Sequence, residues 1–434
     1  MKLRYFGAAS ICIETPDGIK ILCDPWFDTP AFIGSWLPFP KIEFDYKQKY
    51  EYIYISHIHS DHFDINTLSK LNKDSKILIY KFENPFLFKK IKSIGFNNII
   101  QLNHGEKYHV GKDTYIKIYG PIENDSDAKQ QVIDTSLLVK SKKHTILNFN
   151  DNIYELKDKT LLQIKQEYPK IDLLCHGYTS ASSYPQCTLS LDKQEMQNEK
   201  DRVKEHCYRR SIKLIEFLNP KSFMPFAGYY VLCGKNSNLN NLKATDHPYD
   251  ALNYYQKTAK HLLEEKQCVV LNVNEYYDLC NMKCSKEYKH HTEEELNNFV
   301  KDNKSILYPY EHDSTIPDID EYINLIDKAY SRMEKVRKVM NYSTNTKIFI
   351  NLPENKTLIL RMNGQGVHIV DNVFLKNQDD YILMDLDFRL LFMLLRGPRY
   401  AHWDNADHGS HIKYYKKPNK YEKGLYHLIC YFHA

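Results

Sequence analysis

Hydrophobic and polar residues alternate along most of the first 150 positions, in short runs that turn residues separate. The first runs lie at 2–8, 10–15 and 19–26, and the Pro-Asp-Gly sequence at 16–18 is typical of a tight turn between strands. Residues 64–72 have helical spacing instead. Further strand-like runs lie at 51–56, 76–80, 98–102, 114–120, 135–141 and 144–150. Successive hairpins interrupted by helices predict two stacked sheets flanked by helices, rather than a parallel-sheet nucleotide-binding fold.

The second half of the chain has a different pattern. A helical, charged segment at 191–218 precedes a strand-like run at 221–233, and residues 234–316 are polar and rich in Asn, Lys and Glu. Residues 319–340 then have the spacing of an amphipathic helix. Three alternating runs at 347–353, 356–362 and 366–372 predict a β-meander. An apolar run at 383–397, a polar cluster at 402–412 and a final helix at 424–433 follow. The predicted division is a first domain at 1–275, a polar connection at 276–316 and a C-terminal α+β domain at 317–434.

Composition narrows the class of protein. The 434 residues are 42% hydrophobic and carry a net charge of +4, which is ordinary for a soluble globular chain of two or three domains. So small a charge gives no field for a phosphate backbone, and we expect no nucleic-acid partner. No window reaches 18 apolar residues and no signal-peptide pattern opens the chain, so we expect a cytoplasmic protein without a membrane span. The ten scattered cysteines are expected to be reduced thiols.

One motif carries chemistry. Directly after the apolar run at 51–56 come His57, His59, Asp61 and His62. Three imidazoles and a carboxylate beside a buried strand are costly unless a cation gathers them, although a solvated turn is the alternative. On extended backbone His57 and His59 point the same way and can reach one ion, while Asp61 and His62 reach a second. The motif therefore predicts two divalent metal ions.

A second cluster of ligand-type residues lies in a Lys-rich stretch. It consists of Cys280, Cys284, His290 and His291. The spacing is a weak zinc signal, and a loop with incidental ligands is the favoured interpretation.

The histidine motif resembles the signature of the metallo-β-lactamase superfamily. This resemblance implies an α+β fold of the αββα sandwich type with a dinuclear metal site. Members open with a strand pair that ends in an Asp-Pro motif, so Asp24 would orient the histidine loop from behind the ligands. The resemblance also implies that Asp151 bridges the two metals, and a turn cap beside Asn150 and Asn152 is the alternative.

The sequence is more closely similar to one branch, the catalytic part of the CMP-N-acetylneuraminate hydroxylases. The matching segments are ILCDPWF, YIYISHIHSDHF, IDTSLLVKSKKHTILNFND, TSASSYP, NPKSFMPFAGYYV and, more loosely, HWDNADHGSHIKY. This implies an iron-dependent oxygenase that acts on a nucleotide-linked or N-acylated sugar. The hydroxylases carry a Rieske domain, but no Cys-His pair has Rieske spacing here, so a separate electron-donor protein would be needed.

Two positions depart from the superfamily pattern. Gln130 or Gln131 stands where the branch has the third histidine, and Phe226 and Ala227 stand where the last one is expected. Candidates for replacement ligands are His176, His247, His402 and His408. His176 follows a strand that is expected to end on the same face as Asp151. For each candidate, a hydrogen-bonded structural histidine is the alternative.

The remaining site candidates follow from these segments. A dense polar cluster, interpreted as a functional loop or a solvated cap, consists of Arg399, His402, Trp403, Asp404, Asn405, Asp407 and His408. The predicted substrate-binding residues are Arg399, Tyr178, Ser180, Tyr229 and Trp403. Phosphates would be clamped by Arg209, Arg210, Arg396 or Arg399, although Arg209 and Arg210 also fit a solvated helix face. The predicted catalytic residues are Asp61, His176 and His402.

Two reaction classes fit such a site. In the oxidative version the ions are iron and the open positions take dioxygen, and the resemblance favours this version over zinc or manganese. In the hydrolytic version the metals lower the pKa of a water from about 16 toward 7, and Asp61 orients the hydroxide toward a phosphoester, lactone or amide. A metal-free sugar-binding protein is disfavoured because the histidine loop is complete.

Overall fold

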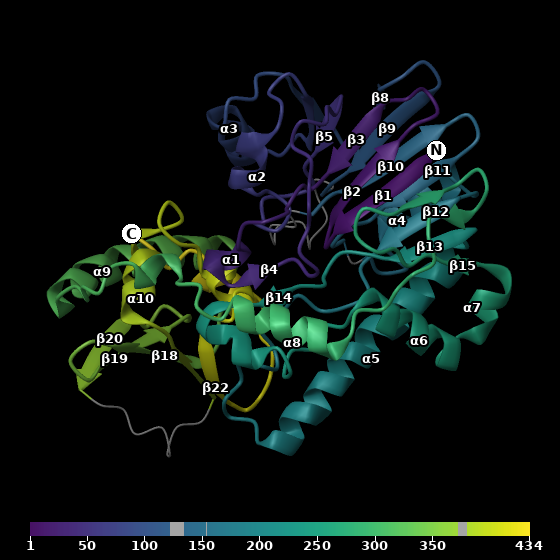
Figure 1. The fold of residues 1–434 in the computed structure, drawn as a ribbon. Coiled ribbons are helices and arrows are strands. Elements are labelled where there is room, and N and C mark those ends of the chain that lie inside the picture. Colours follow the sequence, from purple (N-terminus) through teal and green to yellow (C-terminus); the bar gives the residue numbers. More distant parts are fainter. Residues whose placement is uncertain (122–133, 153, 372–379) are drawn as a thin grey trace.

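The computed structural model describes residues 1–121, 134–152, 154–371 and 380–434. It has two stacked β-sheets with helices on their outer faces, and a smaller α+β unit beside one edge of this sandwich (Figure 1). Among the helices in the described ranges, none combines the length and the apolar composition needed to cross a membrane.

The first sheet has eight strands. Hairpins join β1 to β2 and β2 to β3, and from β3 onward the neighbouring strands run parallel. Its order is β17 (Lys283–Cys284), β16 (Tyr276–Asp278), β1 (Lys2–Gly7), β2 (Ser10–Glu14), β3 (Lys20–Cys23), β5 (Tyr52–Tyr54), β6 (Lys76–Tyr80) and β7 (Ile99–Leu102).

The second sheet has seven strands. It is antiparallel from β8 to β11 and parallel from β11 to β15. Its order is β15 (Gln267–Cys268), β13 (Ser222–Pro225), β12 (Leu173–His176), β11 (Thr145–Asn148), β10 (Ser136–Ser141), β9 (Thr114–Tyr119) and β8 (Lys107–His109).

Helices cover the outer faces of both sheets. Those of the sandwich are α2 (Ile65–Lys70), α3 (Phe86–Ser93), α4 (Lys159–Glu167), α5 (Lys193–Leu218), α6 (Pro248–Thr258) and α7 (Lys260–Glu265). Strand β10 shows why the chain is layered in this way: Leu137 and Val139 pack between the sheets, whereas Leu138 packs against the helices. Because successive side chains of a strand point to opposite faces, an uninterrupted apolar run is buried on both. The predicted αββα sandwich is confirmed.

The C-terminal unit has its own sheet. Its strand order is β20 (Val367–Asp371), β19 (Lys356–Arg361), β18 (Lys347–Leu352), β21 (Tyr381–Asp385) and β22 (Lys413–Lys417). The antiparallel β18, β19 and β20 confirm the predicted meander. The helices of this unit are α9 (Ile319–Val339), α10 (Phe388–Arg396), α11 (Trp403–His408) and α12 (Lys423–Ile429).

The segment predicted as a polar connection has more structure than its composition indicates. Strand β16 pairs with β1, and Tyr277, opposite Leu3, is buried in the core between the sheets. The first sheet therefore continues beyond residue 275, through β16 to the edge strand β17. Helix α8 (Glu293–Asp302) and the 3-10 turn at Pro309–Glu311 complete the connection, and a further 3-10 turn at Gly234–Leu239 precedes it in the first domain.

The sandwich and the C-terminal unit share a hydrophobic core. Trp26 and Phe32, together with Trp36 of the short strand β4 (Trp36–Leu37), belong to the same buried cluster as the inner faces of α9 and α10. Strand β4 pairs with β14 (Val231–Leu232), and Phe32 lies in the short helix α1 (Ala31–Gly34). This shared core fixes α11 beside the histidine loop.

Candidate metal centre

The histidine loop and Asp24 lie at one edge of the first sheet because of strand pairing. Strands β3 and β5 run parallel with Cys23 opposite Tyr54, so the residues that follow them emerge side by side. Asp24 comes directly after β3, and its backbone N–H donates to the carbonyl of Tyr54 at 2.9 Å. His57 follows three residues after Tyr54 and is buried.

Two further carboxylates come from the second sheet. Strands β10 and β11 form an antiparallel hairpin with Leu137 opposite Asn148, so the start of β10 lies beside the end of β11. Asp134 precedes β10 and Asp151 follows β11, which brings both to this edge. The hydroxyl of Thr135 donates to the carbonyl of Ser56 at 2.7 Å and fixes this segment against the histidine loop.

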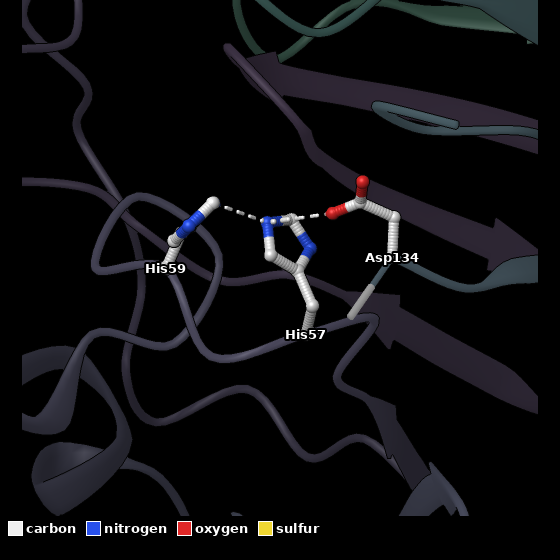
Figure 2. A group of neighbouring side chains, drawn as sticks. All are labelled: His57, His59 and Asp134. Carbon is white, nitrogen blue, oxygen red and sulfur yellow. Dashed lines mark hydrogen bonds and ion pairs between the residues drawn. The ribbon is translucent and has the colours of Figure 1, made fainter. Parts of the chain in front are cut away.

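The first group of potential ligands comprises His57, His59 and Asp134. Nε2 of His57 lies 2.9 Å from Nδ1 of His59 and 3.5 Å from Oδ1 of Asp134. Figure 2 shows the His57 ring between the other two side chains. All three ligand atoms lie within 4.8 Å of one another, which is the spacing needed to hold one ion.

The second group comprises His57, His62 and Asp151. Nε2 of His62 lies 3.1 Å from Oδ2 of Asp151 and 3.4 Å from Oδ2 of Asp61. His57 belongs to both groups, so the two potential ion positions are adjacent. The predicted ligands His57, His59, Asp61, His62 and Asp151 are thus brought together, and the structure adds Asp134.

Asp24 holds the loop from behind. Its Oδ1 accepts from the backbone N–H of Ser56 at 2.8 Å, and its Oδ2 accepts from the Ser56 hydroxyl at 2.7 Å and faces Nδ1 of His62 at 3.1 Å. Asn150 also donates its side-chain amide to Asp24. Since Asp24 occupies Nδ1 of His62, Nε2 is left to point at Asp61 and Asp151. The predicted orienting role of Asp24 agrees with these contacts.

The residues fit divalent metal ions. Oδ1 of Asp61 is buried without a hydrogen-bond partner in the described part of the chain, which is unfavourable for a carboxylate unless a cation faces it. Burial, with His62 and His59 nearby, holds the pKa of His57 well below its usual range, so this imidazole is in the neutral form that binds metals. The set of imidazole and carboxylate donors suits iron, zinc or manganese.

The other charges of the site are strongly coupled. Burial opposes a charge on His62, but Asp61 and Asp151 outweigh it and raise its pKa well above the usual range. Burial and the nearby Asp151 raise the pKa of Asp134 to about 6. Carboxylates crowded together without a cation acquire such shifts.

Helix α11 of the C-terminal unit reaches this centre. Oδ2 of Asp404 lies 2.8 Å from Nε2 of His59. Nδ1 of His408 lies 2.9 Å from the backbone carbonyl of Asp404 and 3.4 Å from its Oδ1. Burial opposes a charge on His408, but Asp404 raises its pKa to about 10. Of the two interpretations of the polar cluster, this contact favours a functional segment.

His176 is not brought to the centre. It stands two positions after Leu174, which packs against the outer helices, so both side chains face outward from the second sheet. Its Nδ1 lies 3.1 Å from the Gly177 carbonyl and 3.3 Å from the hydroxyl of Ser211 on α5. We correct its assignment as a ligand and catalytic residue, because strand periodicity turns it away from Asp151.

Two other candidate histidines cap helices. Nδ1 of His402 accepts from the backbone N–H of Asp404 at the start of α11, and Nδ1 of His247 accepts from that of Tyr249 at the start of α6. Neither belongs to a ligand group among the described residues. His402 nevertheless helps to fix the helix that presents Asp404.

Two predicted substrate-binding aromatics are core residues. Tyr178 is 1% exposed and donates its hydroxyl to the carbonyl of Asp246, and Trp403 is 2% exposed and donates Nε1 to the carbonyl of Phe432. With their polar atoms engaged inside the protein, neither is available to a ligand. We correct both assignments, since aromatic side chains of this size mainly contribute core packing.

The remaining polar candidates lie apart from the ligand groups. Ser180 accepts from the backbone N–H of Ser182, and Tyr229 packs against His247 with ring centroids 4.9 Å apart. Arg399 is exposed in the turn after α10. These three stay predictions.

The predicted phosphate clamps are dispersed. Arg209 is exposed and pairs with Glu205 along α5, and Arg396 lies over the ring of Tyr400 at 3.6 Å. Arg210 is half-buried on α5. The solvated helix face is therefore the correct interpretation for Arg209.

The departures from the superfamily pattern have mixed outcomes. Gln130 and Gln131 lie outside the described residues. Phe226 and Ala227 are buried between the sheets and offer no ligand atom. The cysteines and histidines at 280–291 form no ligand group in the described ranges, which agrees with a loop that carries incidental ligands.

Asp134 was missed from the sequence. It stands in the Ile-Asp-Thr segment, a few residues after the position of the missing histidine. The available signal was the hairpin itself: a residue before its first strand must lie near a residue after its second strand, here Asp151.

Comparison with known proteins identifies the family of the part of the chain that contains this site. Residues 2–184 match the family described as the beta-lactamase superfamily domain. The match covers the histidine loop and the three site carboxylates Asp61, Asp134 and Asp151. The predicted resemblance to the metallo-β-lactamase superfamily is confirmed over this part of the chain.

Curated relatives match about half of the chain. A protein of Mycolicibacterium smegmatis named "Putative Rieske 2Fe-2S iron-sulfur protein" is 31% identical over 43% of this chain and 35% of its own length. The mouse cytidine monophosphate-N-acetylneuraminic acid hydroxylase is 28% identical over 53% of this chain and 39% of its own length. The matched part of this chain therefore spans well under half the length of either relative.

A solved structure, the diiron β-hydroxylase CmlA of Streptomyces venezuelae, aligns with 63% of this chain and 53% of its own, at 13% identity and a TM-score of 0.40. That similarity is too remote to equate individual residues.

Proposed function

Residues 2–184 match the beta-lactamase superfamily domain, and on this premise we propose that the chain is a dinuclear metalloenzyme, an iron-dependent oxygenase that hydroxylates a small molecule. The first domain, residues 1–275 together with strands β16 and β17, would provide the metal ligands. The C-terminal domain from 317 would complete the site.

One observation carries the proposal. Each ligand group consists of two histidines and one aspartate: His57, His59 and Asp134 in one, and His57, His62 and Asp151 in the other. Two histidines and a carboxylate with open positions are typical of non-haem iron oxygenases. Structural zinc sites are instead closed by four ligands.

Bound iron would supply the activation of dioxygen. The residues of the chain would hold the ions and control protons. His57, His59 and Asp134 would hold one ion, and His62 with Asp151, whose carboxylate has two oxygens to offer, would hold the other. Asp61, with one oxygen near His62 and the other unpartnered among the described residues, is positioned to accept or return a proton beside the ions.

The same oxygen supports a hydrolytic alternative. A carboxylate that faces a metal-bound water can orient it as a nucleophile toward a phosphoester, lactone or amide. The favouring observation is again the unpartnered Oδ1 of Asp61. In this alternative the ions would be zinc or manganese.

The substrate and the electron source belong to the same proposal. Similarity to the sialic acid hydroxylase supports a nucleotide-linked or N-acylated sugar as substrate. Similarity to a protein named for a Rieske centre supports an iron-sulfur protein as the electron donor, acting as a separate partner.

The test is metal analysis of the purified protein together with single-turnover chemistry. We expect about two irons per chain and an absorption band that changes when oxygen is admitted to the reduced protein. An N-acylated sugar nucleotide should then yield a hydroxylated product with a chemical reductant as electron source. Stoichiometric zinc with phosphodiesterase or lactonase turnover would instead establish the hydrolytic alternative.

A further inference from the structure

His59 uses both of its ring nitrogens. Its Nδ1 faces Nε2 of His57 at 2.9 Å, within the first ligand group. Its Nε2 lies 2.8 Å from Oδ2 of Asp404, which is 345 positions away in the sequence. A neutral imidazole carries one proton, so a proton on Nε2 that is donated to Asp404 leaves the lone pair of Nδ1 free for an ion.

We propose that Asp404 of the C-terminal unit is the outer-shell partner of the metal ligand His59, and that the unit is thereby a working part of the metal centre. This inference rests on the proposed function in one respect, that an ion binds at His57, His59 and Asp134. Asp404 is a positioning residue: it sets the tautomer and the direction of the His59 ring and makes Nδ1 a stronger ligand.

The same device holds the neighbouring ligand. Nδ1 of His62 is held by Asp24, so Nε2 points at the carboxylates of the site. Asp24 comes from the sandwich itself, whereas Asp404 comes from another unit. Two histidines of the loop are therefore each oriented by a carboxylate, one from the sandwich and one from the C-terminal unit.

Asp404 is itself held rigidly. It lies in the first turn of α11, where its backbone N–H donates to His402, and His408 contacts its carbonyl and its side chain. The carbonyl of His408 accepts from Nε1 of Trp36, and the His408 ring stacks on Phe32 at 5.4 Å. These contacts fix the carboxylate against the sandwich and not only within its own helix.

A second connection leads from the same place to the histidine loop. The backbone N–H of Phe32 donates to the hydroxyl of Ser60, inside the loop, at 2.8 Å. The carbonyl of Phe32 faces Nε2 of His411, just beyond α11, at 2.9 Å. The loop and α11 thus contact the same residue of the sandwich, and their relative position is fixed on both sides of His59.

The experiment measures metal affinity in the full-length protein. Metal-free wild type, Asp404→Asn and Asp404→Ala are titrated with Co²⁺, which serves as a coloured probe, and with Fe²⁺ in the absence of oxygen. We expect two ions in every case, with affinity for one ion about 10–100-fold weaker in the variants and an altered Co²⁺ spectrum for that ion. The loss should be larger in Asp404→Ala, which retains no acceptor.

Asp407→Asn is the matched control. Asp407 lies in the same helix and also joins the units, because Ser183 and Tyr414 donate to its Oδ1 at 2.6 and 2.7 Å, but these contacts do not involve His59. It should weaken the docking of the C-terminal unit and leave the metal affinity within about twofold.

Each result has one meaning. Equal metal losses in Asp404→Asn and Asp407→Asn would overturn the inference, since docking alone would then explain both. The loss of one whole ion in the Asp404 variants would overturn it by making Asp404 a ligand. If Asp404→Asn binds like wild type, the inference fails while the proposed function stands. If wild type binds no ion, the proposed function itself fails.

Discussion

The metal centre and the surroundings of His176 are two buried histidine environments that differ in their charged neighbours. At the centre, His57, His59 and His62 face carboxylates and one another. Beneath α5, His176 faces a backbone carbonyl, a serine hydroxyl and the ring of Phe223. Only the metal centre gathers negative charge, and its carboxylates Asp134 and Asp151 keep 30% and 28% of their side chains exposed.

The difference shows what makes a buried histidine a ligand. At His62 a carboxylate occupies one nitrogen and the other points at further donors. At His176, Nε2 is buried without a hydrogen-bond partner in the described part of the chain, and no carboxylate is among the groups that shift its pKa. Burial lowers its pKa to about 4, so the ring stays neutral and serves the packing of the core.

The largest expected effect comes from His57→Ala. Because His57 is common to both ligand groups and a neutral imidazole ligates one ion, its removal should weaken the binding of at least one ion by roughly 100-fold or more. Metal content after dialysis, measured by mass spectrometry, checks this. His176→Asn is the matched control, a change at a buried histidine outside both groups, and it should retain two ions. Equal losses in the two variants would show that the comparison is wrong.

The next effect comes from Asp24→Asn. Asp24 accepts from Ser56 and Asn150 and holds His62, so the neutral amide should weaken metal binding by about 10–100-fold. It should also lower the free energy of unfolding by about 2–3 kcal/mol, because charge-assisted bonds to a buried group are lost. Calorimetric titration and urea unfolding measure the two quantities.

The control for Asp24 is Asp64→Asn. Asp64 is also buried and accepts from Asn66 and Thr67 at the start of α2, and it belongs to neither ligand group. It should cost about 1 kcal/mol of stability and leave the metal affinity unchanged. If the metal affinity falls in proportion to the free energy of unfolding in both variants, Asp24 has no specific role in orienting the ligands.

The sequence predicted the sandwich well because its signals are local. The alternating run at 135–141 became β10, Ser136–Ser141, and the amphipathic pattern at 319–340 became α9, Ile319–Val339. Such patterns reflect the side-chain period of a strand or a helix, and that period can be recognised from a few residues adjacent in the sequence. Strand β16 was not predicted, because a three-residue strand has too few side chains for a pattern.

The ligands were predictable where they share one loop and less so where the fold assembles them. His57, His59, Asp61 and His62 stand within six positions, whereas Asp404 reaches His59 across 345. His176 could have been excluded as a ligand from the sequence, because alternate residues of its strand point to opposite faces of the sheet. Trp403 could not, since only tertiary packing decides whether an aromatic in a motif lines a site or fills a core.

The smallest expected effect concerns acid stability and His176. Its pKa falls from 6.5 to about 4 on folding, chiefly through burial, with the charge of Arg210 on α5 acting in the same direction. Between these two pKa values the unfolded chain is protonated at His176 and the folded protein is not. The free energy of unfolding therefore decreases as the pH falls from 6.5 toward about 4. Between about pH 8 and pH 5 this amounts to about 2 kcal/mol.

In His176→Asn, which does not titrate, that part of the pH dependence should disappear, as urea unfolding of the metal-free protein at the two pH values measures. His206→Asn, at an exposed position of the same helix α5, should keep the profile of the wild type. An unchanged profile in His176→Asn would mean that His176 is charged in the folded protein. A charged His176 would need a carboxylate beside it, and the two histidine environments would then no longer differ in their charged neighbours.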